Sequence, residues 1–172
     1  KLQGLDNDYD YGEWYSLTKP VREELERQRK EKFSAEPVFS IVIPLYKTPA
    51  RYLKEMLDSI VDQTYGNWEL CLADGSPAGE DVSRIVKPYL DKDSRIKYQI
   101  LGYNRGISEN TNEAIRMAAG DFIVLADHDD VMTPDALYEC AKKINAHPQC
   151  EVLYSDEDKL DMDGCALFDP HF

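Results

Sequence analysis

The stretch that most constrains the fold covers residues 120–134 and reads GDFIVLADHDDVMTP. Its apolar run at 122–126 is typical of a strand buried on both faces of a sheet, although a buried helix segment has the same pattern. The acidic residues 127–130 follow at once, and Thr133 and Pro134 then predict a helix start, as N-cap and first helical residue. We therefore expect a buried strand that brings an acidic turn to one edge of a sheet.

Three residues of this turn are carboxylates, namely Asp127, Asp129 and Asp130. Two unit charges about 4 Å apart repel each other by roughly 4 kcal/mol at an effective dielectric constant near 20. A divalent cation would remove this repulsion, and oxygen ligands suit Mg²⁺ or Mn²⁺. A solvated acidic loop is the alternative, and the position directly after a buried strand favours a functional site. We interpret His128, between the carboxylates, as a solvated side chain rather than a metal ligand.

Composition indicates one folded domain. The 172 residues are 42% hydrophobic, and a chain of this size buries roughly 70% of its unfolded surface. The net charge of −13 argues against a broad nucleic-acid-binding face. The four cysteines lack CxxC spacing, and Cys71 and Cys140 fall inside apolar segments, which indicates that these two are reduced core thiols in a cytoplasmic protein. No stretch is apolar for long enough to predict a membrane span, and none predicts a secretory signal.

The two ends of the sequence predict a piece of a longer protein, because the first residue is Lys1 and the chain stops at Phe172 without a helix-ending signal. Residues 1–37 are polar and predict an N-terminal extension. A helix over 21–32 has too few apolar residues for a strong core face. We expect it to pack loosely on the domain formed by residues 38–172, with docking to a neighbouring domain as the alternative.

Strands and helices alternate along residues 38–172. β-Branched and apolar runs predict strands at 38–46, 68–73, 96–101, 122–126 and 152–154. Apolar residues at helical spacing predict helices between them, one of them capped by Ser108. This alternation predicts an α/β fold in which helices flank a mostly parallel sheet.

Four groups of residues lie at the ends of predicted strands, at 44–46, 74–76, 104–106 and 127–130. Ligands of parallel sheets bind beyond the carboxyl ends of the strands, so we expect these four groups to face one crevice. Asp127 and Asp129 would hold a cation that neutralises a diphosphate, and Arg105 offers a guanidinium for phosphate or a base carbonyl. Asp74 would accept a hydrogen bond from a base or ribose, and Tyr46 would stack on the base. The set predicts a metal-dependent site for a nucleotide diphosphate.

Four motifs, in this order, resemble the nucleotide-binding part of the family 2 glycosyltransferases, which have the GT-A fold. They are SIVIPLY at 40–46, LADGS at 72–76, NRGISENTNEAI at 104–115 and GDFIVLADHDD at 120–130, with YSDEDK at 154–159 as a further similar segment. The resemblance covers residues 38–172. It implies a truncated GT-A domain and inverting transfer of a sugar from a UDP- or dTDP-linked donor to an acceptor hydroxyl, in cell-surface polysaccharide synthesis.

By position, the resemblance implies that Pro44 and Tyr46 line the base pocket. Asp74 would hydrogen-bond the base, normally uracil or thymine, and Arg105 would lie near the base or the phosphates. The family motif around Asp74 often has two acidic residues before its glycine, and here Ala73 takes the first position. This departure leaves the identity of the donor open.

The resemblance also implies the roles of the acidic turn. Asp127 would contact the ribose or the donor sugar, Asp129 would bind Mn²⁺ or Mg²⁺, and both would be catalytic. Asp130 would contact the metal-binding residues rather than the metal itself, or would cap a helix. His128 occupies a position that is usually small in the family.

The general base of the family is an acidic residue at a helix start further downstream, and we expect it beyond Phe172. Asp156 and Glu157 are weaker candidates for this base. We therefore expect donor binding with little transfer by this chain alone. The implied partners are a nucleotide-sugar donor, a glycan or lipid-linked acceptor and further fused domains, in a cytoplasmic protein near the inner face of a membrane.

Two other classes fit part of the sequence. FIVLADHDDV also matches the pattern of haloacid-dehalogenase-type phosphatases, in which Asp127 would be the nucleophile and Asp129 the acid/base. That motif normally follows the first strand of its domain, whereas three strand–helix units precede it here. A non-catalytic calcium module is the second alternative, because acidic residues alternate over 156–164. This run lacks a correctly spaced terminal Glu, so a solvated turn is favoured.

Overall fold

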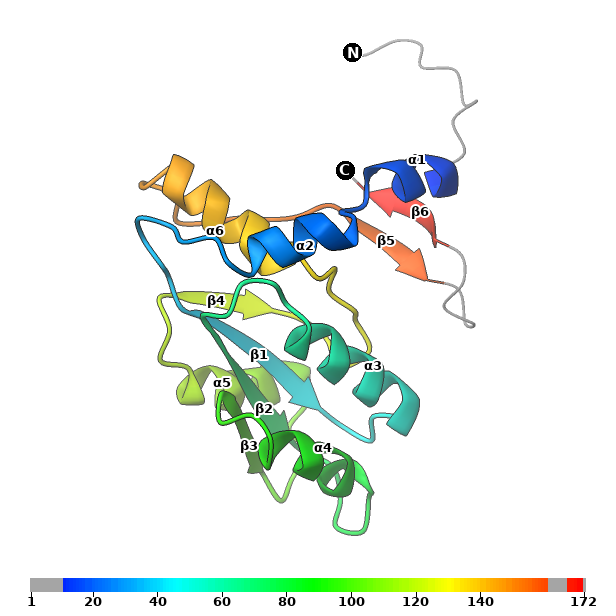
Figure 1. The fold of residues 1–172 in the computed structure, drawn as a ribbon. Coiled ribbons are helices and arrows are strands. Elements are labelled where there is room, and N and C mark those ends of the chain that lie inside the picture. Colours follow the sequence, from blue (N-terminus) through cyan, green and yellow to red (C-terminus); the bar gives the residue numbers. More distant parts are fainter. Residues whose placement is uncertain (1–10, 161–166, 172) are drawn as a thin grey trace, which may run out of the picture.

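A computed structural model describes residues 11–160 and 167–171 and contains a parallel sheet between helices (Figure 1). Its strands are β1 (Phe39–Leu45), β2 (Trp68–Asp74), β3 (Ile96–Ile100) and β4 (Phe122–Leu125), in the order β3-β2-β1-β4. All three pairings are parallel. The predicted α/β fold is confirmed, and the carboxyl ends of the four strands lie at one edge of the sheet.

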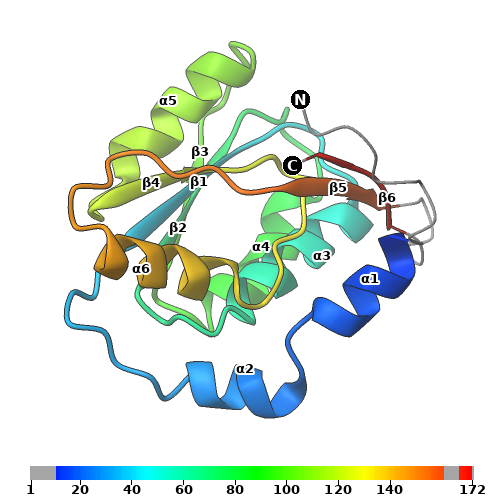
Figure 2. The same ribbon diagram turned by 90° about the horizontal axis from the view of Figure 1, so that it is seen from above.

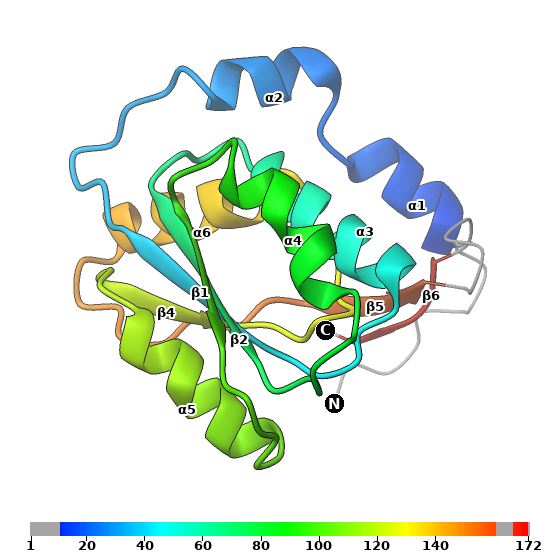
Figure 3. The same cartoon turned by 90° about the horizontal axis from the view of Figure 1, so that it is seen from below.

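Helices cover both faces of this sheet. On one face lie α3 (Ala50–Val61), α4 (Val82–Leu90) and α6 (Ala136–Ala146), and on the other lies α5 (Ile107–Met117) (Figures 2 and 3). Because side chains alternate along a strand, Ile41 and Ile43 of β1 join the larger core, whereas Val42 packs in a second core with Ala114 of α5. β1 is therefore buried along its whole length.

β4 is an edge strand, and the expectation that it is buried on both faces is wrong. Phe122 and Val124 pack against the larger core, but Ile123 and Leu125 are 45% and 70% exposed. These two side chains are exposed because β4 has a neighbouring strand, β1, on one side only, and because α5 lies over β1 and β2. Within residues 11–160 and 167–171, no strand pairs with the outer side of β4.

Two predicted helix starts are displaced. Thr133 and Pro134 lie before the helix rather than at its start, because α6 begins at Ala136. The carbonyl oxygen of Pro134 instead accepts a hydrogen bond from the amide of Thr64, over 2.8 Å, so a tertiary contact holds this turn. α5 begins at Ile107 and follows a glycine with a φ of 89°, so Ser108 is inside the helix.

The fifth strand predicted at 152–154 is wrong. Val152 and Tyr154 are exposed and belong to an irregular segment that pairs with none of the described strands. The next strand is β5 (Glu157–Leu160), which pairs antiparallel with β6 (Leu167–His171) in a separate two-stranded sheet.

The N-terminal segment contains α1 (Tyr11–Thr18) and α2 (Arg22–Gln28). The helix predicted at 21–32 was expected to pack loosely on the domain, but the contacts at its end show that this expectation is wrong. Gln28 is buried and accepts a hydrogen bond from the hydroxyl of Thr64 over 2.9 Å. The guanidinium of Arg29 pairs with Asp62 at 2.6 Å. Within the described part of the chain, no helix has both the length and the apolar character required to cross a membrane.

Candidate functional site at the carboxyl edge of the sheet

The loops that follow β1 and β2 are joined by two hydrogen bonds, one between backbone groups and one from a backbone amide to a side chain. The amide of Gly75 donates to the carbonyl oxygen of Leu45 over 2.9 Å. The amide of Lys47 donates to the hydroxyl oxygen of Ser76 over 2.8 Å. Residues 44–46 and 74–76, which the sequence places 30 positions apart, thus form one continuous rim.

A buried asparagine of α5 attaches the loop after β3 to this rim. Asn110 is 2% exposed, and its Nδ2 atom donates to Oδ1 of Asn104 over 2.9 Å. Its Oδ1 atom accepts a longer hydrogen bond, of 3.4 Å, from the amide of Arg105. Gly75 lies so close that an added Cβ atom would stand 2.6 Å from Asn110 Nδ2. Asn110 was not among the residues predicted for the site, although a polar residue on the inward face of an amphipathic helix was a usable signal.

A cavity of about 270 Å³ connects the end of β1 with α5 and the acidic turn. Two predicted site residues, Pro44 and Asp127, share its wall, and the other lining residues are Val42, Thr111, Leu125, Ala126 and Asp130. Pockets that enclose a whole drug-sized ligand have about 300 to 1,000 Å³. This cavity therefore suits one part of a nucleotide-sized molecule, such as its ribose or diphosphate.

The acidic turn is closed by Asp130, whose Oδ2 atom accepts a hydrogen bond from the amide of Asp127 over 3.1 Å. The carboxylate of Asp127 accepts no hydrogen bond from the described residues, and that of Asp129 is 57% exposed. His128 lies 3.7 Å from Asp129 through Nδ1, a buried atom that has no hydrogen-bond partner among the residues that the structure describes. The side chain of His128 is 31% exposed, so it is solvated only in part.

The donor set of the turn fits a divalent cation only in part. Among the described residues, no three side chains of His, Cys, Asp or Glu converge as a ready-made metal site. Mg²⁺ commonly binds through one or two carboxylates and completes its shell with substrate phosphates and water. Asp129, together with Asp127 in the cavity wall, matches that arrangement.

Apart from Pro44, the residues predicted to contact a base, namely Tyr46, Asp74 and Arg105, do not line this cavity and lie on the rim beside it. Asp74 is 4% exposed, and its Oδ1 atom accepts a hydrogen bond from the amide of Ser76 over 2.8 Å. Tyr46 is exposed, and the ammonium group of Lys47 lies 5.4 Å from the centre of its ring. The guanidinium of Arg105 stands 4.4 Å from the ring centre of Tyr103, which orients it by a cation–π contact.

The weaker candidates for the general base lie elsewhere. Asp156 and Glu157 are exposed at the start of the β5–β6 ribbon, and neither lines the cavity. The proposed calcium run continues into residues 161–164, which lie outside the described residues.

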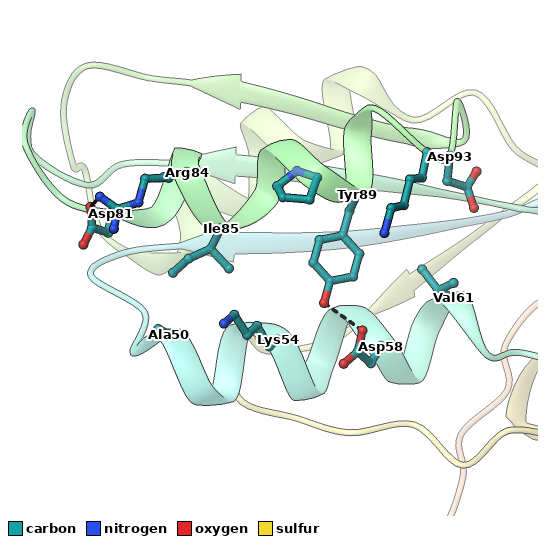
Figure 4. Close-up of a pocket in the computed structure, with 11 residues that line it drawn as sticks. Ala50, Lys54, Asp58, Val61, Asp81, Arg84, Ile85, Tyr89 and Asp93 are labelled. Atoms are coloured by element: carbon teal, nitrogen blue, oxygen red, sulfur yellow. Dashed lines mark hydrogen bonds and ion pairs between the residues drawn. The ribbon is translucent and has the colours of Figure 1, made fainter.

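A larger cavity, of about 630 Å³, lies between α3 and α4 (Figure 4). Its charged and hydroxyl groups largely satisfy one another: the hydroxyl of Tyr89 donates to Asp58 over 2.7 Å, and Arg84 pairs with Asp81 at 3.3 Å. None of the predicted site residues lines it. We therefore place the candidate site at the carboxyl edge of the sheet.

A parallel sheet with convergent polar loops at its carboxyl edge, and an acidic turn after the last strand, defines a nucleotide-binding class of α/β protein. The sequence model of glycosyl transferase family 2 matches residues 40–160, and the chain belongs to this family. The resemblance seen in the motifs is thereby confirmed. The phosphatase alternative is not supported, because the acidic turn follows the edge strand of a sheet whose sequence belongs to another family.

The curated relatives are much longer than this chain. It is 40% identical over 136 residues to the uncharacterized protein y4gI of Sinorhizobium fredii, covering 79% of this chain and 15% of the relative. It is 30% identical over 155 residues to the O-antigen biosynthesis protein RfbC of Myxococcus xanthus, covering 90% of this chain and 12% of the relative. It is 28% identical over 142 residues to a chondroitin synthase of Escherichia coli, covering 80% of this chain and 20% of the relative. The chain thus spans a fifth or less of these relatives.

Solved structures confirm the GT-A fold. TarS 1-349 of S. aureus, crystallised in complex with UDP-GlcNAc, matches with 27% identity and a TM-score of 0.60, over 64% of this chain and 32% of that chain. The mannosyltransferase PcManGT of Pyrobaculum calidifontis, in complex with GDP-Man and Mn²⁺, matches with 21% identity and a TM-score of 0.58. The match covers 70% of this chain and 37% of that chain. The second likeness is one of fold alone.

Proposed function

We propose that this chain binds the UDP- or dTDP-linked sugar donor of a glycosyltransferase that acts in cell-surface polysaccharide synthesis. The observation that carries the proposal is the shared cavity wall of Pro44 and Asp127, which joins the predicted base side of the site to the acidic turn. The bound UDP-GlcNAc of TarS and the O-antigen role in the name of RfbC support the donor and the pathway.

On the base side, Tyr46 stacks on the base, Asp74 accepts a base N–H, and Arg105 approaches a base carbonyl or a phosphate. The exposed ring of Tyr46 and the cation–π contact between Arg105 and Tyr103 support these roles, because both groups are presented in the open rim. Pro44 and the small cavity beside it would hold the ribose or the first phosphate.

On the diphosphate side, Asp129 would hold Mn²⁺ or Mg²⁺ and Asp127 would contact the ribose or donor sugar. When bound, the cation neutralises the diphosphate and stabilises it as a leaving group. Asp130 keeps the turn closed around these two carboxylates through its hydrogen bond with the amide of Asp127. Without a cation, the carboxylates would repel the diphosphate that they are placed to receive.

The proposed reaction is a single displacement with inversion at the sugar, in which a general base removes the proton of the acceptor hydroxyl. Because Asp156 and Glu157 stand away from the cavity, we assign the base to another part of the protein. The acceptor is a glycan or a lipid-linked sugar, and the protein works at the inner face of a membrane. By itself, this chain would bind the donor and transfer little sugar.

Isothermal titration calorimetry of the 172-residue chain with UDP, with and without Mn²⁺, tests the proposal. UDP should bind, and Mn²⁺ should tighten its binding. Asp129→Ala should reduce that gain by at least roughly tenfold, as expected when a metal site loses a supporting ligand. Asp81→Ala is the matched control, because Asp81 is an exposed carboxylate paired with Arg84 on α4. Absence of binding by UDP, dTDP or GDP in the unaltered chain would refute the proposal.

A further inference from the structure

The hydroxyl of Tyr98 in β3 donates a hydrogen bond to Oδ2 of Asp74 over 2.5 Å. In the register of β2 with β3, Tyr98 pairs with Leu72 and Ile100 pairs with Asp74. The two partners are therefore two positions apart on neighbouring strands and on the same face of the sheet. A hydroxyl that donates to a carboxylate forms a charge-assisted hydrogen bond, one of the stronger kinds in proteins.

Tyr98 is itself firmly held. Its ring packs against the larger core, and burial and the hydrogen bond with Asp74 both raise the pKa of its hydroxyl well above 10.0. The hydroxyl therefore stays protonated at neutral pH and acts as a constant donor.

These contacts leave the Asp74 carboxylate little freedom to turn. Its Oδ1 atom accepts from the amide of Ser76 and its Oδ2 atom from Tyr98, so two donors on different oxygens fix its plane. An ionised carboxylate can only accept hydrogen bonds. At the position of N3 it therefore favours uracil or thymine, whose N3–H is a donor, over cytosine, whose N3 is an acceptor and whose donor is the exocyclic N4 amino group.

We propose that Tyr98 is a positioning residue of the donor site, which fixes the Asp74 carboxylate so that it accepts N3–H of uracil or thymine and rejects cytosine. The inference rests on the proposed function, since it assumes that the rim around Asp74 receives the base. It gives a role in donor choice to a residue that lies outside the four motifs.

The test compares UDP with UDP methylated at N3 of the uracil, which cannot donate this hydrogen bond. Dissociation constants of both are measured by calorimetry, with Mn²⁺, for the unaltered chain and for Tyr98→Phe. Tyr98→Phe should weaken UDP binding roughly tenfold, the worth of one hydrogen bond to a charged group, and leave the binding of methylated UDP within about twofold. Tyr89→Phe is the matched control, because its hydroxyl donates to the carboxylate of Asp58 on the outer surface of α3 and α4; it should change neither constant.

The outcomes separate the inference from the proposed function. Equal losses for both ligands, or no loss for either, would overturn the positioning role of Tyr98 while the donor site stood. If the unaltered chain bound neither ligand, the proposed function would fail and the inference with it. One further measurement needs no variant: the Tyr98 hydroxyl proton should give a downfield NMR signal that shifts with UDP and stays in place with methylated UDP. A signal unmoved by UDP would contradict the inference even if Tyr98→Phe did not fold.

Discussion

The backbone of Gly75 lies directly against the side-chain amide of Asn110, so that a Cβ atom on Gly75 would stand 2.6 Å from Nδ2 and 3.1 Å from the carbonyl oxygen of Tyr103. Glycine is needed here for closeness rather than for an unusual φ. The contact brings the loops after β2 and β3 together and so fixes the shape of the rim.

Gly75→Ala should therefore push these two loops apart. We expect a loss of about 1–3 kcal/mol in the free energy of unfolding, typical of overpacking, and a weaker affinity for UDP. Urea unfolding and calorimetry measure the two effects. Gly66→Ala is the matched control, because no atom lies within 4 Å of a Cβ built at Gly66. Equal stability of the two variants would show that Asn110 moves aside freely.

Asp130→Ala should open the acidic turn, because the amide of Asp127 loses its acceptor. We expect UDP and Mn²⁺ to bind roughly five- to tenfold more weakly, in keeping with the loss of one hydrogen bond. Asp130→Asn keeps an oxygen acceptor at the same place and should retain most of the affinity. If Asn and Ala at this position bound the ligands equally weakly, the charge of Asp130 rather than its hydrogen bond would be responsible.

Glu69 of β2 gives the folded state a dependence on pH. Burial raises the pKa of its carboxyl, but hydrogen bonds from Lys97, the amide of Ala119 and the hydroxyl of Ser40 outweigh burial and lower the pKa below 4.5. The stabilisation from a carboxyl with a lowered pKa is fully present above its ordinary value and is lost as pH falls through the folded value. The unaltered chain should therefore lose stability below pH 4.5.

Glu69→Gln removes this titrating group. We expect it to cost about 1–3 kcal/mol of unfolding free energy at pH 7 and to flatten the decline of stability below pH 4.5. Urea unfolding at pH 3.5, 5 and 7 measures both effects. Glu139→Gln, which breaks an exposed pair with Lys142, should follow the unaltered chain. The same slope below pH 4.5 in Glu69→Gln and in the unaltered chain would contradict the assignment.

Cys71 should be unreactive in the folded chain. It is completely buried in β2, and burial raises the pKa of its thiol to about 11. Because the thiolate is the reactive form, iodoacetamide at pH 8 should modify Cys71 only after unfolding, and should modify the partly exposed Cys150 first. Peptide mapping by mass spectrometry gives the order of modification. Labelling of both at the same rate would mean that β2 opens readily.

The sequence alone was sufficient for the parallel sheet, since apolar runs followed by helical spacing leave little freedom in an α/β chain. It also predicted which loops meet, because the carboxyl ends of parallel strands share one edge. Pro44, Asp127 and Asp129 lie at that edge for this reason. Their roles toward a donor remain predictions.

The tertiary structure decided what depends on neighbours distant in sequence. An apolar run does not reveal whether a strand is central or at an edge, so the exposure of Ile123 and Leu125 followed only from the strand order. The contacts of Tyr98 with Asp74 and of Asn110 with Gly75 depend on strand register and on where α5 crosses the sheet. Local spacing determines which face a side chain takes, whereas only the packed fold determines which partner it meets there.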